Sequence, residues 1–167
     1  MPRFTIAVLV RNQFGVLNRV TSMFRRRRFN INCLTVSETE SAEYSRITVS
    51  SEGESVEKQQ LIDQLYKLPD VCSIKELREN DSVSCELMLI KVKNEPEFRS
   101  DIRDAAEAFG AKTVDYTRDS VVMQMTGSTQ RIDAFIDLMR DYTILEICRT
   151  GIVSLERGST TIRKTEG

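Results

Sequence analysis

Two spacings of hydrophobic residues alternate along the chain, and each predicts a different kind of element. In residues 4–10, FTIAVLV, apolar side chains at every second position share one face, which is the period of a β-strand. From Val16 the spacing changes to three and four residues, the period of an amphipathic helix. Pro69 ends a second helix. The predicted βαββαβ order covers residues 4–10, 16–28, 31–39, 43–51, 54–68 and 71–77.

The same order begins again after a polar segment, ENDSV, which is expected to be a linker. The second series covers residues 85–93, 98–109, 111–117, 120–127, 129–141 and 144–155. Gly110 fits a helix C-terminus, and the last strand either runs unbroken or breaks at Gly151. Each series predicts a ferredoxin-like unit, so the fold class is α+β, with antiparallel sheets and helices on one face. The expected bounds are a domain at 1–78, the linker at 79–83, a domain at 84–157 and a polar tail at 158–167.

Composition narrows the possible partners of the chain. It has 167 residues, of which 40% are apolar and 29% charged, as is typical of a globular protein. A net charge of −1 provides no global field for nucleic acid or anionic lipid, so neither is an expected partner. No apolar run approaches the roughly 20 residues of a membrane span, and the N-terminus is better explained as a strand than as a signal peptide.

Histidine is absent from the chain, which removes the commonest general base and metal ligand. The sequence also lacks the glycine-rich phosphate-binding motifs and the nucleophile and zinc motifs of common enzymes. Acid–base chemistry by Asp, Glu or Lys remains possible, but no polar cluster points to it. No catalytic residue, metal site or cofactor is therefore assigned. Four cysteines without a paired spacing are expected to be buried, reduced thiols, which fits a cytoplasmic protein.

The turn between the first strand and the first helix is the strongest candidate site. A helix N-terminus presents unpaired N–H groups and about half a positive charge, which suits a carboxylate. Gly15 lets a ligand approach the backbone, and Asn12 can donate or accept a hydrogen bond. Val16 and Leu17 would supply apolar walls. A small aliphatic amino acid would suit this site, although the same residues could serve only to start the helix.

The internal repeat offers a comparison for this turn. Asn94 occupies the position of Asn12 in the second unit, but Glu97 stands where Gly15 stands in the first. Glu97 and the neighbouring Glu95 would repel a ligand carboxylate while stabilising the helix N-terminus themselves. If the first turn binds a ligand, the second is expected to be closed.

A second polar cluster lies where the second strand begins. Asn30 and Asn32 flank Ile31, although asparagine is a poor strand former. Because this strand lies at a sheet edge in the predicted topology, Asn30 could reach a partner chain; the alternative is a turn residue on a solvated edge. Ala7 and Leu9 would also lie on the sheet face that the helices leave bare. Self-association to at least a dimer is therefore expected.

Four consecutive arginines, Arg25–Arg28, raise the alternative of nucleic-acid binding, since RNA-recognition modules share the βαββαβ order. Those modules carry an aromatic motif on their third strand, which is absent from EYSRITVSS. The arginines fall in the last turn of a helix, where cations complement the helix dipole. A solvated helix end is favoured, with RNA binding or docking of an acidic protein surface as alternatives.

The stretches NQFGVLNRV, RFNINCLTVSETE, YSRITV, QLYKLPDV, CELMLIKV and RTGIVSLERG resemble, in order, the regulatory (small) subunits of acetolactate synthase. The resemblance implies an N-terminal ACT domain, a second ferredoxin-like domain and no active site in this chain. It further implies a catalytic large subunit that carries thiamine diphosphate, magnesium and usually FAD. The small subunit would activate that partner and confer feedback inhibition by valine or a related branched-chain amino acid. An ACT-type sensor for a different enzyme is the alternative.

The resemblance also implies an effector site between the ACT domains of a homodimer. Its residues would be Asn12, Gln13, Phe14, Gly15, Val16, Leu17, Asn30 and Ile31. Two positions depart from the family pattern. Phe14 replaces the usual proline and could crowd the site. Arg28 stands where the family usually has glycine, and in a left-handed conformation arginine would cost about 1–2 kcal/mol, unless the helix ends differently.

Overall fold

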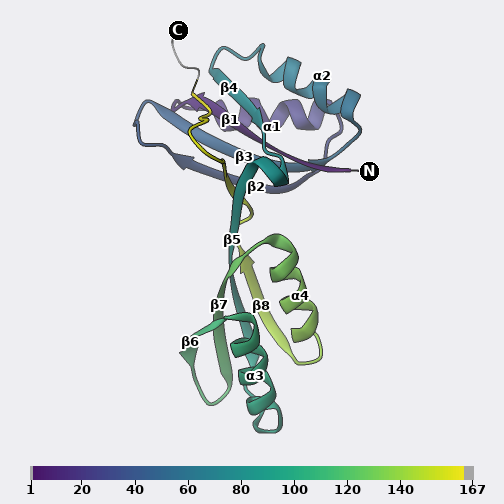
Figure 1. Ribbon diagram of the computed structural model, residues 1–167, viewed down its shortest axis with the longest axis vertical. Coiled ribbons are helices and arrows are strands. Elements are labelled where there is room, and N and C mark those ends of the chain that lie inside the picture. Colours follow the sequence, from purple (N-terminus) through teal and green to yellow (C-terminus); the bar gives the residue numbers. More distant parts are fainter. Residues whose placement is uncertain (1, 164–167) are drawn as a thin grey trace. The chain divides into compact units, whose positions relative to one another are not determined.

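The computed structural model describes residues 2–163, and it divides the chain into two compact units (Figure 1). The first unit contains the residues up to Ser84 together with those from Ile152 onward, and the second runs from Cys85 to Gly151. The chain therefore leaves the first unit, forms the second and returns to the first.

Because the chain returns, the residues from Ile152 onward belong to the first unit. The pattern assigns residues 84–157 to the second domain, followed by a polar tail at 158–167. In the structure, residues 152–157 group with the first unit instead, as do the described residues of the tail. Residues 164–167 of the tail lie outside the described residues.

The first unit has the elements β1 (Arg3–Arg11), α1 (Val16–Arg26), β2 (Ile31–Glu38), β3 (Tyr44–Glu52), α2 (Ser55–Leu65) and β4 (Val71–Glu76). Its strands pair antiparallel in the order β2-β3-β1-β4, which confirms the ferredoxin-like topology and places β2 at an edge. Helices α1 and α2 cover one face of the sheet (Figure 1).

Alternation along β1 builds the core of this unit. Phe4, Ile6, Val8 and Val10 are buried together with the apolar face of the two helices, including Phe24. Each fully buried side chain of this size stabilises the fold by about 1.5–3 kcal/mol. The apolar positions that predicted the elements are therefore the ones that hold them together.

The opposite face of the sheet is covered by the returning chain. Ala7 and Leu9 lie on that face, with relative exposures of 0% and 5%. Strand β9 (Val153–Glu156) belongs to this unit and pairs with β5 (Ser82–Lys93). The expectation that Ala7 and Leu9 lie bare is therefore wrong, because the chain buries them itself, whereas self-association stays a prediction.

Side chains of the sheet hold the backbone of this returning segment. Arg46 donates from Nη2 to the Ser154 carbonyl at 2.8 Å, and Thr35 Oγ1 donates to the Ile152 carbonyl at 3.3 Å. The Ile152 N–H donates to Cys33 Sγ at 3.1 Å. We call residues 152–163 the C-terminal strap. Burial beneath it lowers the pKa of the Arg46 guanidinium.

The second unit contains η2 (Pro96–Phe98), α3 (Arg99–Phe109), β6 (Lys112–Tyr116), β7 (Ser120–Gly127), α4 (Thr129–Met139) and β8 (Ile144–Arg149), with most of β5. The strand order β6-β7-β5-β8 repeats that of the first unit. Met88, Ile90 and Val92 of β5 form the core with Ile102 and Phe135 of the helices. The second ferredoxin-like unit is thus confirmed.

The boundaries differ from the predicted ones at two places. The predicted final strand breaks into β8 and β9, with Gly151 at φ +82° between them. The predicted linker contains a short 3-10 turn, η1 (Glu79–Asp81), and the start of β5. No helix among the described residues is long and apolar enough to span a membrane.

The cysteines are free but are not all buried. Cys33 and Cys72 are half-buried, whereas Cys85 and Cys148 are exposed. The expectation of buried thiols is wrong for the latter two. Cys148 pairs with Leu89 on the sheet face away from the buried side chains of β5, and Cys85 shares that alternation.

Candidate functional site

Gly15 ends the turn between β1 and α1 in a conformation that favours glycine. It is the N-cap of α1, with φ +79°. A Cβ built on it would lie 3.0 Å from Arg19 Nη1, which is tighter than ordinary van der Waals contact. The backbone angle therefore favours glycine at this position, whereas the Arg19 atom is the end of a flexible side chain and can shift.

Arg19 also reaches this turn, although it is not among the site residues that the sequence predicts. Its guanidinium binds Asp70 Oδ2 through Nη2 at 2.5 Å and Nε at 3.1 Å. Nη2 also donates to the Phe14 carbonyl at 3.4 Å. The sequence signal for this residue is its spacing of one helical turn after Gly15.

The N-terminus of α1 is open to an anion. Its first turn has no acidic residue and its N-cap provides no side-chain hydrogen bond. The partial positive charge of the helix end is therefore not neutralised by a side chain of the first turn, whereas the charge of Arg19 is paired with Asp70. A carboxylate is the ligand group that this end of the helix favours.

Asn12 is held by the loop that precedes β3. Its Nδ2 donates to the Ala42 carbonyl at 3.1 Å and to Glu38 Oε1 at 3.5 Å, and its N–H donates to the Glu43 carbonyl. Its Oδ1 has no hydrogen bond within the described part of the chain. The side chain is therefore fixed with an acceptor free, which suits the ammonium group of an amino acid.

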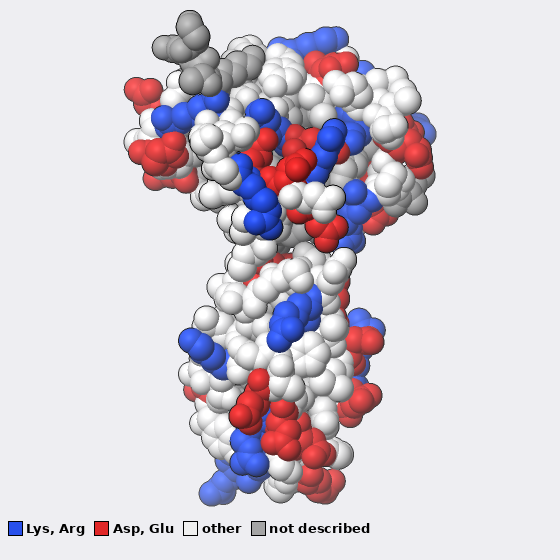
Figure 2. Space-filling model, viewed as in Figure 1, with Lys and Arg blue, Asp and Glu red and all other residues white. Residues whose placement is uncertain are grey.

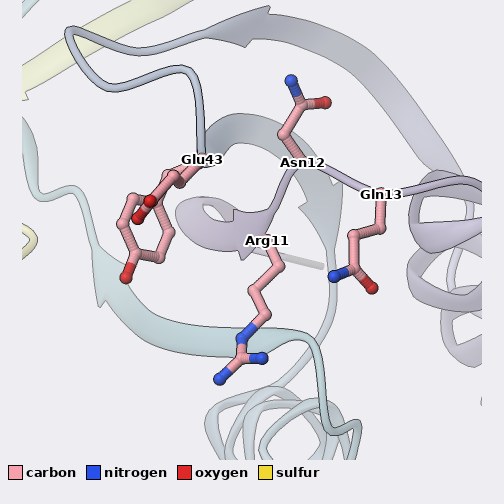
Figure 3. A pocket seen from close by; sticks show the side chains of 5 residues that line it. Arg11, Asn12, Gln13 and Glu43 are labelled. Carbon is pink, nitrogen blue, oxygen red and sulfur yellow. The ribbon is translucent and has the colours of Figure 1, made fainter.

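A pocket of about 480 Å³ adjoins this turn (Figure 3). Its lining consists of Arg11, Asn12, Gln13, Glu43 and Tyr44. In Figure 3, Arg11 and Gln13 point to one side of the strand end and Asn12 to the other. The lining holds one cation and one anion, as a zwitterionic ligand requires. Its volume lies in the range of small-molecule sites.

The hydrophobic residues of the candidate turn lie in different environments. Phe14 is fully exposed, so within one chain it does not crowd the turn. Val16 is buried in the core, whereas Leu17 is exposed beside the turn. Of the two, Leu17 is the one that can touch a ligand from outside.

Asn30 and Ile31 lie at the other end of the sheet. Ile31 pairs with Ser51 at one end of β3, whereas Arg11 pairs with Tyr44 at the other. One chain therefore does not bring Asn30 and Ile31 together with the Asn12–Gly15 turn. A site that uses both groups needs a second copy of the chain.

The helix that precedes Asn30 ends in a left-handed residue even though that residue is arginine. Arg28 has φ +60°, its N–H donates to the Arg25 carbonyl at 3.1 Å, and the Phe29 N–H donates to the Phe24 carbonyl at 2.9 Å. These are the two bonds of a Schellman motif. Arg28 thus adopts the left-handed conformation that glycine favours, and the strain predicted for it is present.

The corresponding asparagine of the second unit is fully engaged. Asn94 is buried, its Nδ2 donates to the Thr117 carbonyl at 2.6 Å, and its Oδ1 accepts from Arg99 Nε at 3.1 Å. Its N–H donates to the Asp119 carbonyl at 2.9 Å. Unlike the Oδ1 of Asn12, the buried Oδ1 of Asn94 already accepts a hydrogen bond from a cation.

Charge is mixed over the surface. On the face that Figure 2 shows, basic and acidic side chains are interspersed over both units. Arg25–Arg28 are exposed at the end of α1 and in the turn after it. Their position agrees with a solvated helix end.

Comparisons with known proteins cover nearly the whole chain. Residues 6–73 match the family described as the AHAS small subunit-like ACT domain, and residues 85–158 match the family described as the small subunit of acetolactate synthase. A probable acetolactate synthase small subunit from Archaeoglobus fulgidus is 46% identical over 94% of this chain and 98% of its own. The Bacillus subtilis small subunit is 44% identical over 92% of this chain and 90% of its own.

A solved structure agrees with these matches. The crystal structure of the acetolactate synthase small subunit from Thermotoga maritima is 32% identical and superposes with a TM-score of 0.88. The alignment covers 96% of this chain and 100% of that one. The chain therefore belongs to the acetolactate synthase small subunit family, with an N-terminal ACT domain.

Proposed function

We propose that the chain is a regulatory subunit that activates the catalytic large subunit of acetolactate synthase and makes it sensitive to valine or a related branched-chain amino acid. Family membership supports the role, and the open N-terminus of α1 supports the ligand. Thiamine diphosphate, magnesium and FAD belong to the catalytic subunit in this proposal, and the complex is cytoplasmic. The chain itself contributes no catalytic group.

The effector carboxylate meets the N–H groups of the first turn of α1 at Gly15, with Arg19 alongside. Its ammonium group donates to Asn12 Oδ1. Its aliphatic side chain contacts Leu17. Each charge-assisted hydrogen bond contributes about 1.5–3 kcal/mol, enough in combination for a small zwitterion to bind.

A homodimer completes this site. Because Asn30 and Ile31 lie at the far end of the sheet from Asn12, they come from the second copy, through the edge strand β2. The effector then changes activity by binding one arrangement of the dimer more tightly than another. The homodimer forms through sheet edges, because the strap already covers the open face of the ACT sheet.

The test is valine inhibition of the reconstituted complex with Gly15→Asp. The new carboxylate faces the effector carboxylate, so the apparent affinity for valine should fall by more than about tenfold. Gly15→Asn has nearly the same size and tolerates positive φ without the charge, so it should retain more of the response. Gly110→Asp in the second unit also substitutes a glycine of positive φ, and it should leave inhibition intact.

Two outcomes would count against the proposal. If valine inhibits the complex that contains Gly15→Asp as strongly as it inhibits the wild-type complex, this turn is not the effector site. Failure of the wild-type chain to raise acetolactate formation by the large subunit would remove the regulatory role and leave a sensor for a different enzyme.

A further inference from the structure

A second cavity, of about 470 Å³, lies within the second unit and is not used by the proposed function. It lies between α3 and the strands β6 and β7, next to the turn that follows β5. Its volume falls in the range of small-molecule sites. The nature of a ligand can be inferred from the floor and the rim.

The floor of the cavity is apolar. Ile102 of α3 and Val121 and Met123 of β7 contribute buried side chains to it. A ligand with an apolar body would therefore remove hydrophobic surface of its own from water without leaving a polar group of the floor unpaired.

The edge strand leaves this floor open to the outside. Thr113 of β6 pairs with Met123 of the floor and contributes only a short side chain to the lining of the cavity. The pairing of β6 with β7 shifts register between Thr113 and Asp115, and such an irregularity bends the strand. All side chains of β6 are exposed. The cavity thus results from a short side chain and an irregular edge.

The rim of the cavity is positive. Arg99 and Arg103 lie one helical turn apart on α3, and no aspartate or glutamate is among the lining residues. Buried Asn94 accepts from Arg99 Nε at 3.1 Å and fixes that guanidinium. Within residues 2–163, Arg103 makes only a long ion-pair contact of 3.8 Å, with exposed Asp104. One fixed and one adaptable guanidinium therefore border an apolar floor.

We propose that this cavity binds a small amphipathic monocarboxylic acid, with a body about the size of an aromatic ring. The carboxylate is held between Arg99 and Arg103, since guanidinium groups match carboxylate geometry. The apolar body lies on Met123. This binding is separate from the effector turn of the first unit and does not depend on it.

The experiment uses the full chain and three probes of similar shape: phenylacetate, 2-phenylethanol and 2-phenylethylamine. Binding is followed by calorimetry and by the methyl resonances of methionine. We expect phenylacetate to bind and to shift the Met123 methyl signal while Met23 of the first unit stays unchanged. The neutral and cationic probes should bind at least about tenfold more weakly.

Substitutions in the chain test whether phenylacetate binds in this cavity. Arg103 is 76% exposed, so Arg103→Gln should fold normally and weaken phenylacetate binding by about tenfold or more. Arg140→Gln changes an arginine of similar exposure outside the cavity and should have no effect. Thr113→Leu should block binding by filling the cavity. A valine response that survives in Thr113→Leu would show that the two sites are independent.

The proposal is overturned by any of four results. These are no phenylacetate binding up to about 10 mM, equal binding of phenylacetate and 2-phenylethanol, unchanged binding by Arg103→Gln, and resonance shifts confined to the first unit.

Discussion

At the scale of single residues, the two units end corresponding helices at positive φ with different side chains. Arg28 lies as far beyond Asn12 as Gly110 lies beyond Asn94, and both end a helix at positive φ, +60° and +70°. Glycine adopts this conformation without cost, whereas arginine is strained in it. The comparison within one chain isolates the effect of the side chain from that of the fold.

Arg28→Gly is expected to stabilise the first unit by about 1 kcal/mol, because the strain of a side chain at positive φ is removed. The gain is partly offset by the greater freedom of glycine in the unfolded state. Urea unfolding would measure it. Gly110→Arg should lower the stability of the second unit by a similar amount, and a destabilised Arg28→Gly would contradict this account.

A buried ion pair in the second unit gives a larger expected effect. Glu86, whose side chain is 4% exposed, accepts from Arg149 Nε at 2.5 Å and Nη2 at 3.1 Å, and from Thr129 Oγ1 at 3.0 Å. Glu86→Ala should cost about 1–2 kcal/mol, since it removes the buried acceptor of Arg149 and Thr129, which are themselves partly exposed. Asp133 also binds Arg149 but is half exposed, so Asp133→Ala should cost less than about 1 kcal/mol.

The direction of the Arg149 pKa shift determines how the contribution of this ion pair to stability depends on pH. The Glu86 hydrogen bond raises the pKa of Arg149 above its usual value. A cation whose pKa is raised on folding stabilises the fold at every pH below its unfolded pKa and loses the effect only as pH rises through the folded value. The Arg149 contribution should therefore be constant between about pH 6 and 9 in thermal unfolding, as arginine stays protonated there.

At the scale of elements, the sequence predicted most helices and strands, because the alternating spacing of strands and the three-to-four-residue spacing of helices were both clear. Residues 4–10 and 16–28 became β1 and α1 within a few positions, and the break at Gly151 was one of two alternatives. The route of the chain after Gly151 was not predictable from local pattern. The strap depends on Arg46 and Cys33 contacting residues far along the sequence. Periodicity carries no information on such contacts.

A chain ending at Thr150 should expose the face that carries Ala7 and Leu9. Because an open apolar sheet face promotes association, this variant should be less stable and should form oligomers that grow with concentration. Light scattering after size exclusion would detect them. A chain that ends at Arg163 keeps the strap and is the matched control. Equal behaviour of the two truncated chains would show that the strap does not protect the face.

At the scale of the whole molecule, our proposal divides the effector site between two copies of the chain. The sequence identified Asn12, Gly15 and Asn30, but Arg19 emerged only from the geometry, since its role depends on Asp70. Periodicity also placed Asn30 on an edge strand without showing that it lies at the far end of the sheet from Asn12. The period of a strand predicts which face a side chain occupies, whereas its distance from residues of another strand depends on how the strands pair.

Mixing variants tests a shared site directly. Chains with Gly15→Asp and chains with Asn30→Asp should each lose the valine response alone. In an equal mixture, half of the dimers combine both chains, and each of these has one intact site, so about a quarter of the sites should recover. Calorimetry with valine would count them. No recovery after exchange of subunits would place the whole site within one chain.

The sulfur of Cys33 provides an intrinsic probe of motion. Since Cys33 Sγ accepts the Ile152 N–H, it is engaged whenever the strap is seated, whereas Cys85 and Cys148 are always accessible. Alkylation measured at each cysteine separately should therefore be fast at Cys85 and Cys148 and slow at Cys33, with the half-buried Cys72 as a site away from the strap, and the rate at Cys33 reports how often the C-terminal segment detaches. Comparing that rate with and without valine, or with and without the large subunit, would reveal whether regulation passes through this segment.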